Sequence, residues 1–253
     1  MLQPLIKQNQ PHLKGLRQLA PLTETRRWPW KILMPLLIMA LLIPAVILLA
    51  SRHSAPSVLS EGRLVGGRSP VPLAVMLVLD DSGSFASYAR MRLTALDQVA
   101  QWVPVNLRSD DTLTVITFAD SAYLTLPTTT VADLASRRPT YQDGDVGSGT
   151  AIQPALQAAV EAAPDDMMST LVVVTDTEIA DGGDTNAIQS FVKQLDAPTM
   201  SVITPNGIGV QAGWKTAFPW EAEFHADPDN ADDIALAVGQ ALAHATGQEL
   251  ERA

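Results

Sequence analysis

Short oxygen-bearing side chains gather directly after an apolar run of the sequence. The chain reads VPLAVMLVL at 71–79 and then DDSGSF, so Asp80, Ser82 and Ser84 alternate while Gly83 permits a tight loop. Alternate residues that leave a strand can point at one spot, and carboxylate and hydroxyl oxygens suit a hard cation such as Mg²⁺ or Mn²⁺. The alternative is a structural turn, because Ser and Asp are ordinary loop residues.

Two distant segments carry oxygens of the same kind. GSGT at 147–150 places Thr150 at the start of a predicted helix, and VVVTD at 172–176 brings Asp176 to the end of another apolar strand. Ligands of open α/β sheets bind at the carboxyl ends of the strands, so we expect Asp80 and Asp176 to lie at one edge. Mg²⁺ takes six oxygens and usually keeps several waters, so a few protein oxygens are enough for a site.

Alternating strands and helices must position these residues. Strands are predicted at 71–80, 112–120, 123–129, 169–176, 199–205 and 222–226. Helices are predicted at 87–103, 150–163, 186–196 and 230–247. Pro127 moves the strand at 123–129 to the edge of the sheet, because proline cannot donate to a strand ladder. The alternation predicts an α/β fold with a mostly parallel sheet and helices on both faces.

The three polar segments together resemble the metal-ion-dependent adhesion site of von Willebrand factor A domains. The residues that match its pattern are Asp80, Ser82, Ser84, Thr150, Thr175 and Asp176. The intervening SDDTLTVITFADSA at 109–122 looks like the second strand of the family. The resemblance covers residues 71–246 and implies a Rossmann-like three-layer sandwich whose mostly parallel central sheet has one antiparallel edge strand. We therefore expect the domain at 71–247 and a C-terminal tail at 248–253.

The resemblance also implies roles for the site residues. Ser82 and Ser84 would ligate the cation directly, and Thr150 would do so directly in one conformation and through water in another. Asp80 and Asp176 would act mostly through water or by holding the hydroxyls in place. The cation would be Mg²⁺, with Mn²⁺ or Ca²⁺ as alternatives, and a protein partner would supply an exposed Asp or Glu as the last ligand.

The sequence departs from the family at two positions of the pattern. Thr177 stands where many relatives have glycine, and Asp81 stands where many have an apolar or small residue. Asp143 and Asp145 could form an accessory cation site, although a solvated loop is the favoured interpretation. Solvated loop positions are also favoured for Glu178, Asp181 and Asp184, whose spacing does not fit an EF-hand.

An uncharged segment of 19 residues precedes the predicted domain. ILMPLLIMALLIPAVILLA at 32–50 is long enough to cross a bilayer and predicts a transmembrane signal-anchor helix. Lysines and arginines concentrate in the tail at 1–31, so the positive-inside rule keeps that tail in the cytoplasm and exports the domain. Residues 51–70 are rich in Ser, Gly, Pro and Arg and are expected to be a linker.

Composition excludes several classes of function. The 253-residue chain has no cysteine, which excludes disulfides and a cysteine nucleophile. Residues 1–70 carry nine Lys and Arg against two acidic residues, whereas residues 71–253 carry eight against 25. This acidic part repels nucleic acid, and no basic stripe with interleaved aromatic residues is present.

We expect a membrane-tethered binding module and not an enzyme. An alternative is an accessory subunit that helps to assemble a membrane complex together with a MoxR-type AAA+ ATPase, because small membrane proteins with this domain are similar to partners of such ATPases. A third interpretation is a metal-dependent hydrolase. No general base stands out for such a reaction, and Ser82 and Ser84 lie in no G-x-S-x-G motif.

Overall fold

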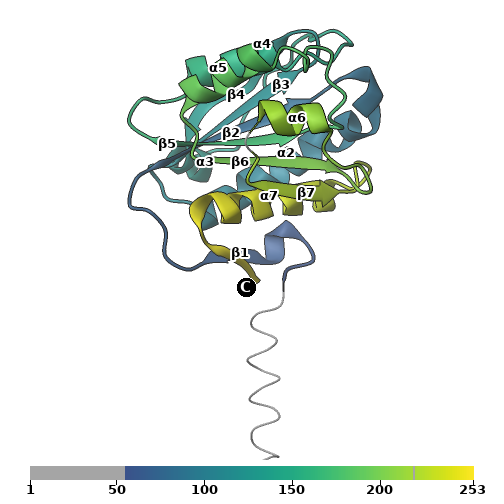
Figure 1. Cartoon of the computed structure of the whole chain (residues 1–253). Coiled ribbons are helices and arrows are strands. Elements are labelled where there is room, and N and C mark those ends of the chain that lie inside the picture. Colours follow the sequence, from purple (N-terminus) through teal and green to yellow (C-terminus); the bar gives the residue numbers. More distant parts are fainter. Residues whose placement is uncertain (1–54, 219) are drawn as a thin grey trace, which may run out of the picture. The chain divides into compact units, whose positions relative to one another are not determined.

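A six-stranded sheet forms the centre of the part that the computed structural model describes, residues 55–218 and 220–253 (Figure 1). Its strand order is β4-β3-β2-β5-β6-β7, and every neighbouring pair is parallel except β3 and β4. The strands are β2 (Leu73–Asp80), β3 (Thr112–Phe118), β4 (Ala122–Thr130), β5 (Met168–Val174), β6 (Thr199–Pro205) and β7 (Ala222–Ala226). The prediction of a mostly parallel α/β sheet with one antiparallel edge strand is therefore confirmed.

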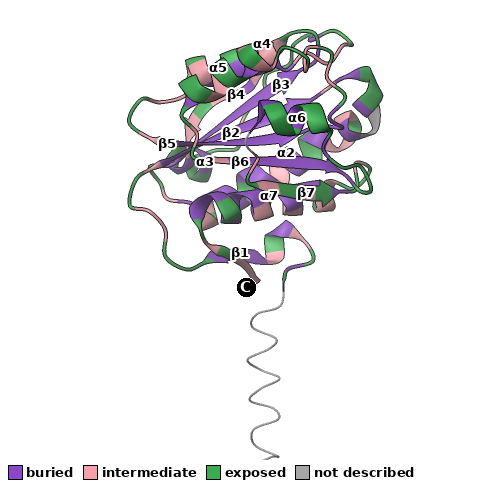
Figure 2. Ribbon diagram, viewed as in Figure 1, coloured by how far each residue is buried: buried purple, intermediate pink, exposed green. Residues whose placement is uncertain are grey.

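Helices cover both faces of this sheet (Figure 1). They are α2 (Ala86–Asn106), α3 (Val131–Ser136), α4 (Gln153–Ala162), α5 (Thr185–Leu195), α6 (Ala212–Ala217) and α7 (Ala231–Thr246). Buried residues of α2, α3 and α7 form one core cluster with the sheet, and those of α4, α5 and α6 form the other. Figure 2 shows the central strands buried along their length.

Strand β2 shows why its sequence is a continuous apolar run. All eight of its residues are buried, and successive side chains enter opposite clusters. Leu77 packs with α2 and α7, whereas Met76 and Val78 pack with α4 and α5. A strand that is covered on both faces needs apolar residues at every position until it leaves the core. The first polar residue, Asp80, marks that exit and places the candidate site.

A second, two-stranded sheet includes residues of the predicted linker at 51–70 and of the predicted tail at 248–253. Strand β1 (Gly62–Val65) pairs antiparallel with β8 (Glu249–Arg252), and a short 3-10 turn, η1 (Leu59–Glu61), precedes it. Leu59 is 1% exposed, and a Cβ on Gly239 of α7 would lie only 2.3 Å from its Cδ1 atom. These residues pack on the domain because Leu59 and Leu64 join the core cluster of α2 and α7. This pairing could not be predicted from the sequence, because it joins segments that lie almost 190 residues apart in the chain.

The structure contradicts the predicted localisation. No helix among residues 55–218 and 220–253 is long and apolar enough to cross a membrane. The predicted cytoplasmic tail at 1–31 and the predicted span at 32–50 lie outside the described residues.

Candidate metal centre

Asp80 joins the carboxyl ends of two neighbouring strands. Its side chain is fully buried, and its Oδ1 atom accepts a hydrogen bond from the Ser82 backbone amide at 2.9 Å. Its Oδ2 atom accepts one from the Thr175 hydroxyl at 2.7 Å, directly after β5. One carboxylate therefore orients the loop after β2 and the loop after β5 at the same time.

The DDSGSF loop brings two serine hydroxyls together. After β2 the Asp81 amide donates to the carbonyl of Phe118 on β3, and a 3-10 turn, η2 (Gly83–Phe85), follows. This turn places the Oγ atoms of Ser82 and Ser84 3.1 Å apart, so the two hydroxyls form a hydrogen bond with each other. Ser82 is buried and Ser84 is exposed, so the hydroxyl pair lies where the loop meets solvent.

The loop that carries Thr150 reaches the serine loop through its backbone. The Gly83 amide donates to the Ser148 carbonyl at 3.4 Å, and the Ala180 amide donates to the Thr150 carbonyl at 2.8 Å. Thr150 is half-buried between these two contacts. The structure thus places the three segments that the sequence singled out next to one another, at one end of the sheet.

Asp120 holds the GSGT loop, a role that sequence reasoning missed. Its Oδ2 atom accepts a hydrogen bond from the Ser148 amide at 2.9 Å. A Cβ on Gly149 would lie 1.8 Å from its Oδ1 atom, so only glycine fits over this carboxylate. The amides of Gly149 and Ser148 hold the pKa of Asp120 below its ordinary value of 3.8. The two glycines around Ser148 were the signal for such a close approach.

The loop after β5 supplies Asp176 and also caps the N-terminus of helix α4. Asp176 is 8% exposed, and its Oδ1 atom accepts from the Glu178 amide at 3.0 Å. Asp181 accepts from the amides of Ile152 and Gln153 at 3.0 and 2.9 Å, so it caps the first turn of α4. Asp181 is therefore a capping residue that fixes the chain just after Thr150.

Two carboxylates lie close enough to repel each other at this edge. The pKa of Asp80 is raised, mainly because burial disfavours the charged form, and the charge of Asp176 raises it further. Hydrogen bonds from Ser82 and Thr175 act in the opposite direction. A bound cation would relieve this repulsion, and a carboxylate buried near another is a common feature of cation sites.

The donor chemistry fits a hard divalent cation. Hydroxyl and carboxylate oxygens surround the edge, and Ser84 and Thr150 leave it open to solvent. In the described part of the chain, no group of three or more His, Cys, Asp or Glu residues gathers as a metal cluster, so a site here depends on its hydroxyls. The buried hydroxyl of Thr177 has no hydrogen-bond partner among the described residues, which leaves a further oxygen beside Asp176.

The weaker sequence candidates have other contacts. Asp143 and Asp145 are exposed, and their carboxylates accept from the amides of Gly144 and Gly147 within their own loop. Their proposed accessory site stays a prediction. Trp214, Phe218 and Trp220 stack on one another, and the first two are buried in the core below α6.

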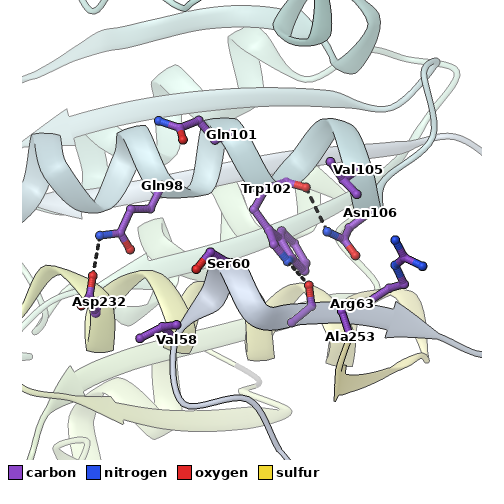
Figure 3. Close-up of a pocket in the computed structure, with 11 residues that line it drawn as sticks. Val58, Ser60, Arg63, Gln98, Gln101, Trp102, Val105, Asn106, Asp232 and Ala253 are labelled. Carbon is purple, nitrogen blue, oxygen red and sulfur yellow. Dashed lines mark hydrogen bonds between the residues drawn. The ribbon is translucent and has the colours of Figure 1, made fainter.

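The pocket drawn in Figure 3 lies away from this edge. It has a volume of about 480 Å³ and lies against η1, β1, α2 and α7. Two of its polar side chains have partners within the pocket wall: Trp102 donates to the Gly62 carbonyl, and Gln98 donates to Asp232. None of the predicted site residues lines it.

Comparison with known proteins agrees with this arrangement. Residues 75–178 match the family model of the von Willebrand factor type A domain. This segment is less than half of the chain, and it contains all five predicted site residues. No curated protein sequence matches the chain.

Several solved structures are similar to this chain at low sequence identity. Proximal thread matrix protein 1 from the mussel byssus matches with a TM-score of 0.52 and 14% identity, over 72% of this chain and 50% of that one. A second structure of that mussel protein, described with a zinc-occupied MIDAS motif, matches with a TM-score of 0.48 and 14% identity, over 70% of this chain and 48% of that one. An aerotolerance-related membrane protein from Bacteroides fragilis matches with a TM-score of 0.45 and 20% identity, over 68% of this chain and 99% of that one. The family match supports a von Willebrand factor type A domain at residues 75–178, and the first of the mussel structures shares the fold.

Proposed function

We propose that this domain binds a protein partner through a divalent cation held at the carboxyl edge of its sheet. The observation that carries the proposal is the convergence of three distant segments on one edge. Asp80 bonds to Thr175, the hydroxyls of Ser82 and Ser84 lie together, and the Thr150 loop contacts both neighbouring loops.

The donor set explains why such a cation would bind a partner. Ser82, Ser84 and Thr150 offer neutral hydroxyls, while the Asp80 carboxylate is occupied by Ser82 and Thr175. A cation with few anionic ligands retains affinity for a further carboxylate, and Mg²⁺ usually keeps exchangeable positions. We propose Mg²⁺ as the ion, with Mn²⁺ and Ca²⁺ as alternatives, and an exposed Asp or Glu of the partner as the incoming ligand.

We propose a binding module and not an enzyme. The Ser82 and Ser84 hydroxyls bond each other, and their described contacts include no histidine. The two histidines in the described residues contact Thr204 and Glu221 instead, so neither pairs with a serine as a general base. The same edge has an open face and an exposed hydroxyl, and a cation bound there would complete what recognition of a carboxylate requires.

Partner capture with a cation-site variant tests the proposal. The immobilised full chain would be incubated with extract of its source cells in Mg²⁺, and captured proteins would be identified by mass spectrometry. We expect a partner that is lost in EDTA and lost with Asp176→Ala in Mg²⁺. Gly183→Ala serves as the control, because a Cβ there meets no atom within 4 Å. Identical captured proteins in all four arms would contradict cation-dependent binding.

A further inference from the structure

A buried ion pair lies directly beside the candidate cation site. Arg92 of α2 contacts Asp81 with 2.5 Å between Nη1 and Oδ1, and the two side chains are only 10% and 20% exposed. Asp81 stands between the predicted ligands Asp80 and Ser82. A charge pair with so little solvent is weakly screened, so it acts on any cation bound next to it.

The backbone fixes the direction in which Asp81 points. Its amide is held by the Phe118 carbonyl at 2.9 Å, and the next amide, that of Ser82, is held by Asp80. With both amides fixed, the Asp81 carboxylate is turned to α2, where it meets Arg92. Arg92 in turn is 8% exposed, and neither its Nε nor its Nη1 atom makes a hydrogen bond with the described residues, so Nη1 meets Asp81 as a contact between charges. The ion pair is therefore the described interaction that holds this guanidinium in place.

Two stacked aromatic rings of the same loop and helix lie near the ion pair. Phe85 and Tyr88 stack with ring centroids 4.7 Å apart, and both are buried. The charges of Arg92, Asp80 and Asp81 all act on the buried Tyr88 phenol, so this ring lies near all three. A loop clamped in this way cannot turn the Asp81 carboxylate to the cation without breaking the ion pair.

We infer that Arg92 is a positioning residue that withholds the Asp81 carboxylate from the cation and cancels its charge. The inference rests on the cation site proposed above. Without the pair, the uncompensated charge of a carboxylate one residue from two predicted ligands would strengthen cation binding and lower the ion's demand for a partner's carboxylate. Arg92 thus limits the negative charge around the cation. A cation with few anionic ligands keeps its affinity for the carboxylate of a partner.

Manganese titration of the full chain separates this role from a structural one. We expect Arg92→Gln to bind Mn²⁺ roughly threefold or more tightly than wild type, because an unpaired negative charge is left beside the ion. Asp81→Asn should bind roughly threefold more weakly, because Arg92 is then uncompensated. The double variant Asp81→Asn/Arg92→Gln should return to within about twofold of wild type. If the ion pair only holds the loop in place, Arg92→Gln should bind Mn²⁺ more weakly than wild type, because a looser loop weakens binding. The double variant should then also bind Mn²⁺ more weakly than wild type.

Arg90→Gln is the matched control. Arg90 lies on the same helix and pairs with Asp229 at 3.1 Å, but these side chains are 70% and 62% exposed. The substitution Arg90→Gln changes the net charge by the same amount as Arg92→Gln. We expect Arg90→Gln to bind Mn²⁺ with wild-type affinity, because solvent screens the exposed ion pair.

The outcomes distinguish this inference from the proposed function. A wild-type chain that binds no Mn²⁺ overturns the cation site and this inference with it. Binding by wild type and Arg90→Gln, without tightening in Arg92→Gln, overturns this inference alone. Should Arg92→Gln fail to fold by circular dichroism, the double variant decides: wild-type affinity supports the inference, and a large loss of affinity overturns it.

Discussion

At the scale of single residues, Thr177 is the most constrained side chain near the site. Its φ is +67°, in the left-handed region that β-branched residues rarely adopt, and the residue is fully buried. Its hydroxyl has no hydrogen-bond partner among the described residues, whereas its amide donates to the Thr175 hydroxyl. A glycine at this position would remove both the backbone strain and the unpaired buried hydroxyl. The loop therefore keeps Asp176 in place at the expense of stability.

Thr177→Gly should stabilise the protein. Relief of the left-handed backbone gives about 1–2 kcal/mol and removal of the buried hydroxyl adds to it, while the greater freedom of glycine in the unfolded chain takes back about 1 kcal/mol. We expect a gain of about 1 kcal/mol in urea unfolding, measured in EDTA. Asp196→Gly is the control, since Asp196 also has a positive φ of 45° but is exposed and of a residue type that tolerates it. A less stable Thr177→Gly protein would contradict this account of the turn.

Asp120 should make the folded state sensitive to acid. Its folded pKa lies below the ordinary value of 3.8, so its charged form contributes stability that is fully present above that value. This contribution is lost as the pH falls through the lowered folded pKa. We expect wild type to be more stable than Asp120→Asn at pH 6 and the difference to shrink at about pH 3, as followed by urea unfolding. A difference that is constant over this range would show that the charge of Asp120 is not involved.

The candidate ligands could be named from the sequence, but the residues that hold their loops in place could not. Asp80, Ser82 and Ser84 are local in sequence, and their spacing already indicated a cation site. Asp120 acts on Ser148 and Asp181 acts on Ile152, 28 and 29 residues apart. Hydrogen bonds and caps between residues so far apart in sequence leave no periodic pattern, so only the folded chain identifies them.

At the scale of elements, the main strands and helices were predictable because their burial follows their sequence. Strand β3 is buried at all seven positions and is an apolar and threonine run, as a covered strand must be. Helix α4 begins at Gln153 and not at Thr150, because Asp181 caps the amides of Ile152 and Gln153 and leaves Thr150 in the loop. The capping carboxylate thus determines whether the threonine lies in a helix or at the site.

Leu59→Ala tests whether η1 and β1 belong to the folded domain. Leu59 is 1% exposed and packs on Gly239, so its truncation leaves a cavity. We expect a loss of about 2–4 kcal/mol in the free energy of unfolding, measured with urea. Leu93→Ala is the matched control, because Leu93 is 50% exposed and its loss should change stability by no more than about 0.5 kcal/mol. Equal effects of the two substitutions on stability would indicate that Leu59 does not pack into the core, as expected if residues 51–70 were a linker.

At the scale of the whole molecule, the sheet explains how residues far apart in sequence share one site. Strands β2 and β5 are parallel neighbours, so Asp80 and Thr175 leave the core side by side although 95 residues separate them. The alternation of strands and helices was sufficient to predict this edge. The β1–β8 pair was not predictable in the same way, because two four-residue strands carry no comparable pattern.

The most direct test of the cation site is calorimetric titration of the full chain with MnCl₂. We expect one saturable site in wild type, and at least about tenfold weaker binding in Ser84→Ala, whose exposed hydroxyl is a predicted ligand. Gly183→Ala should bind like wild type, since its added Cβ touches nothing within 4 Å. A wild-type chain that releases no saturable heat, or a Ser84→Ala isotherm identical to that of wild type, would contradict the site.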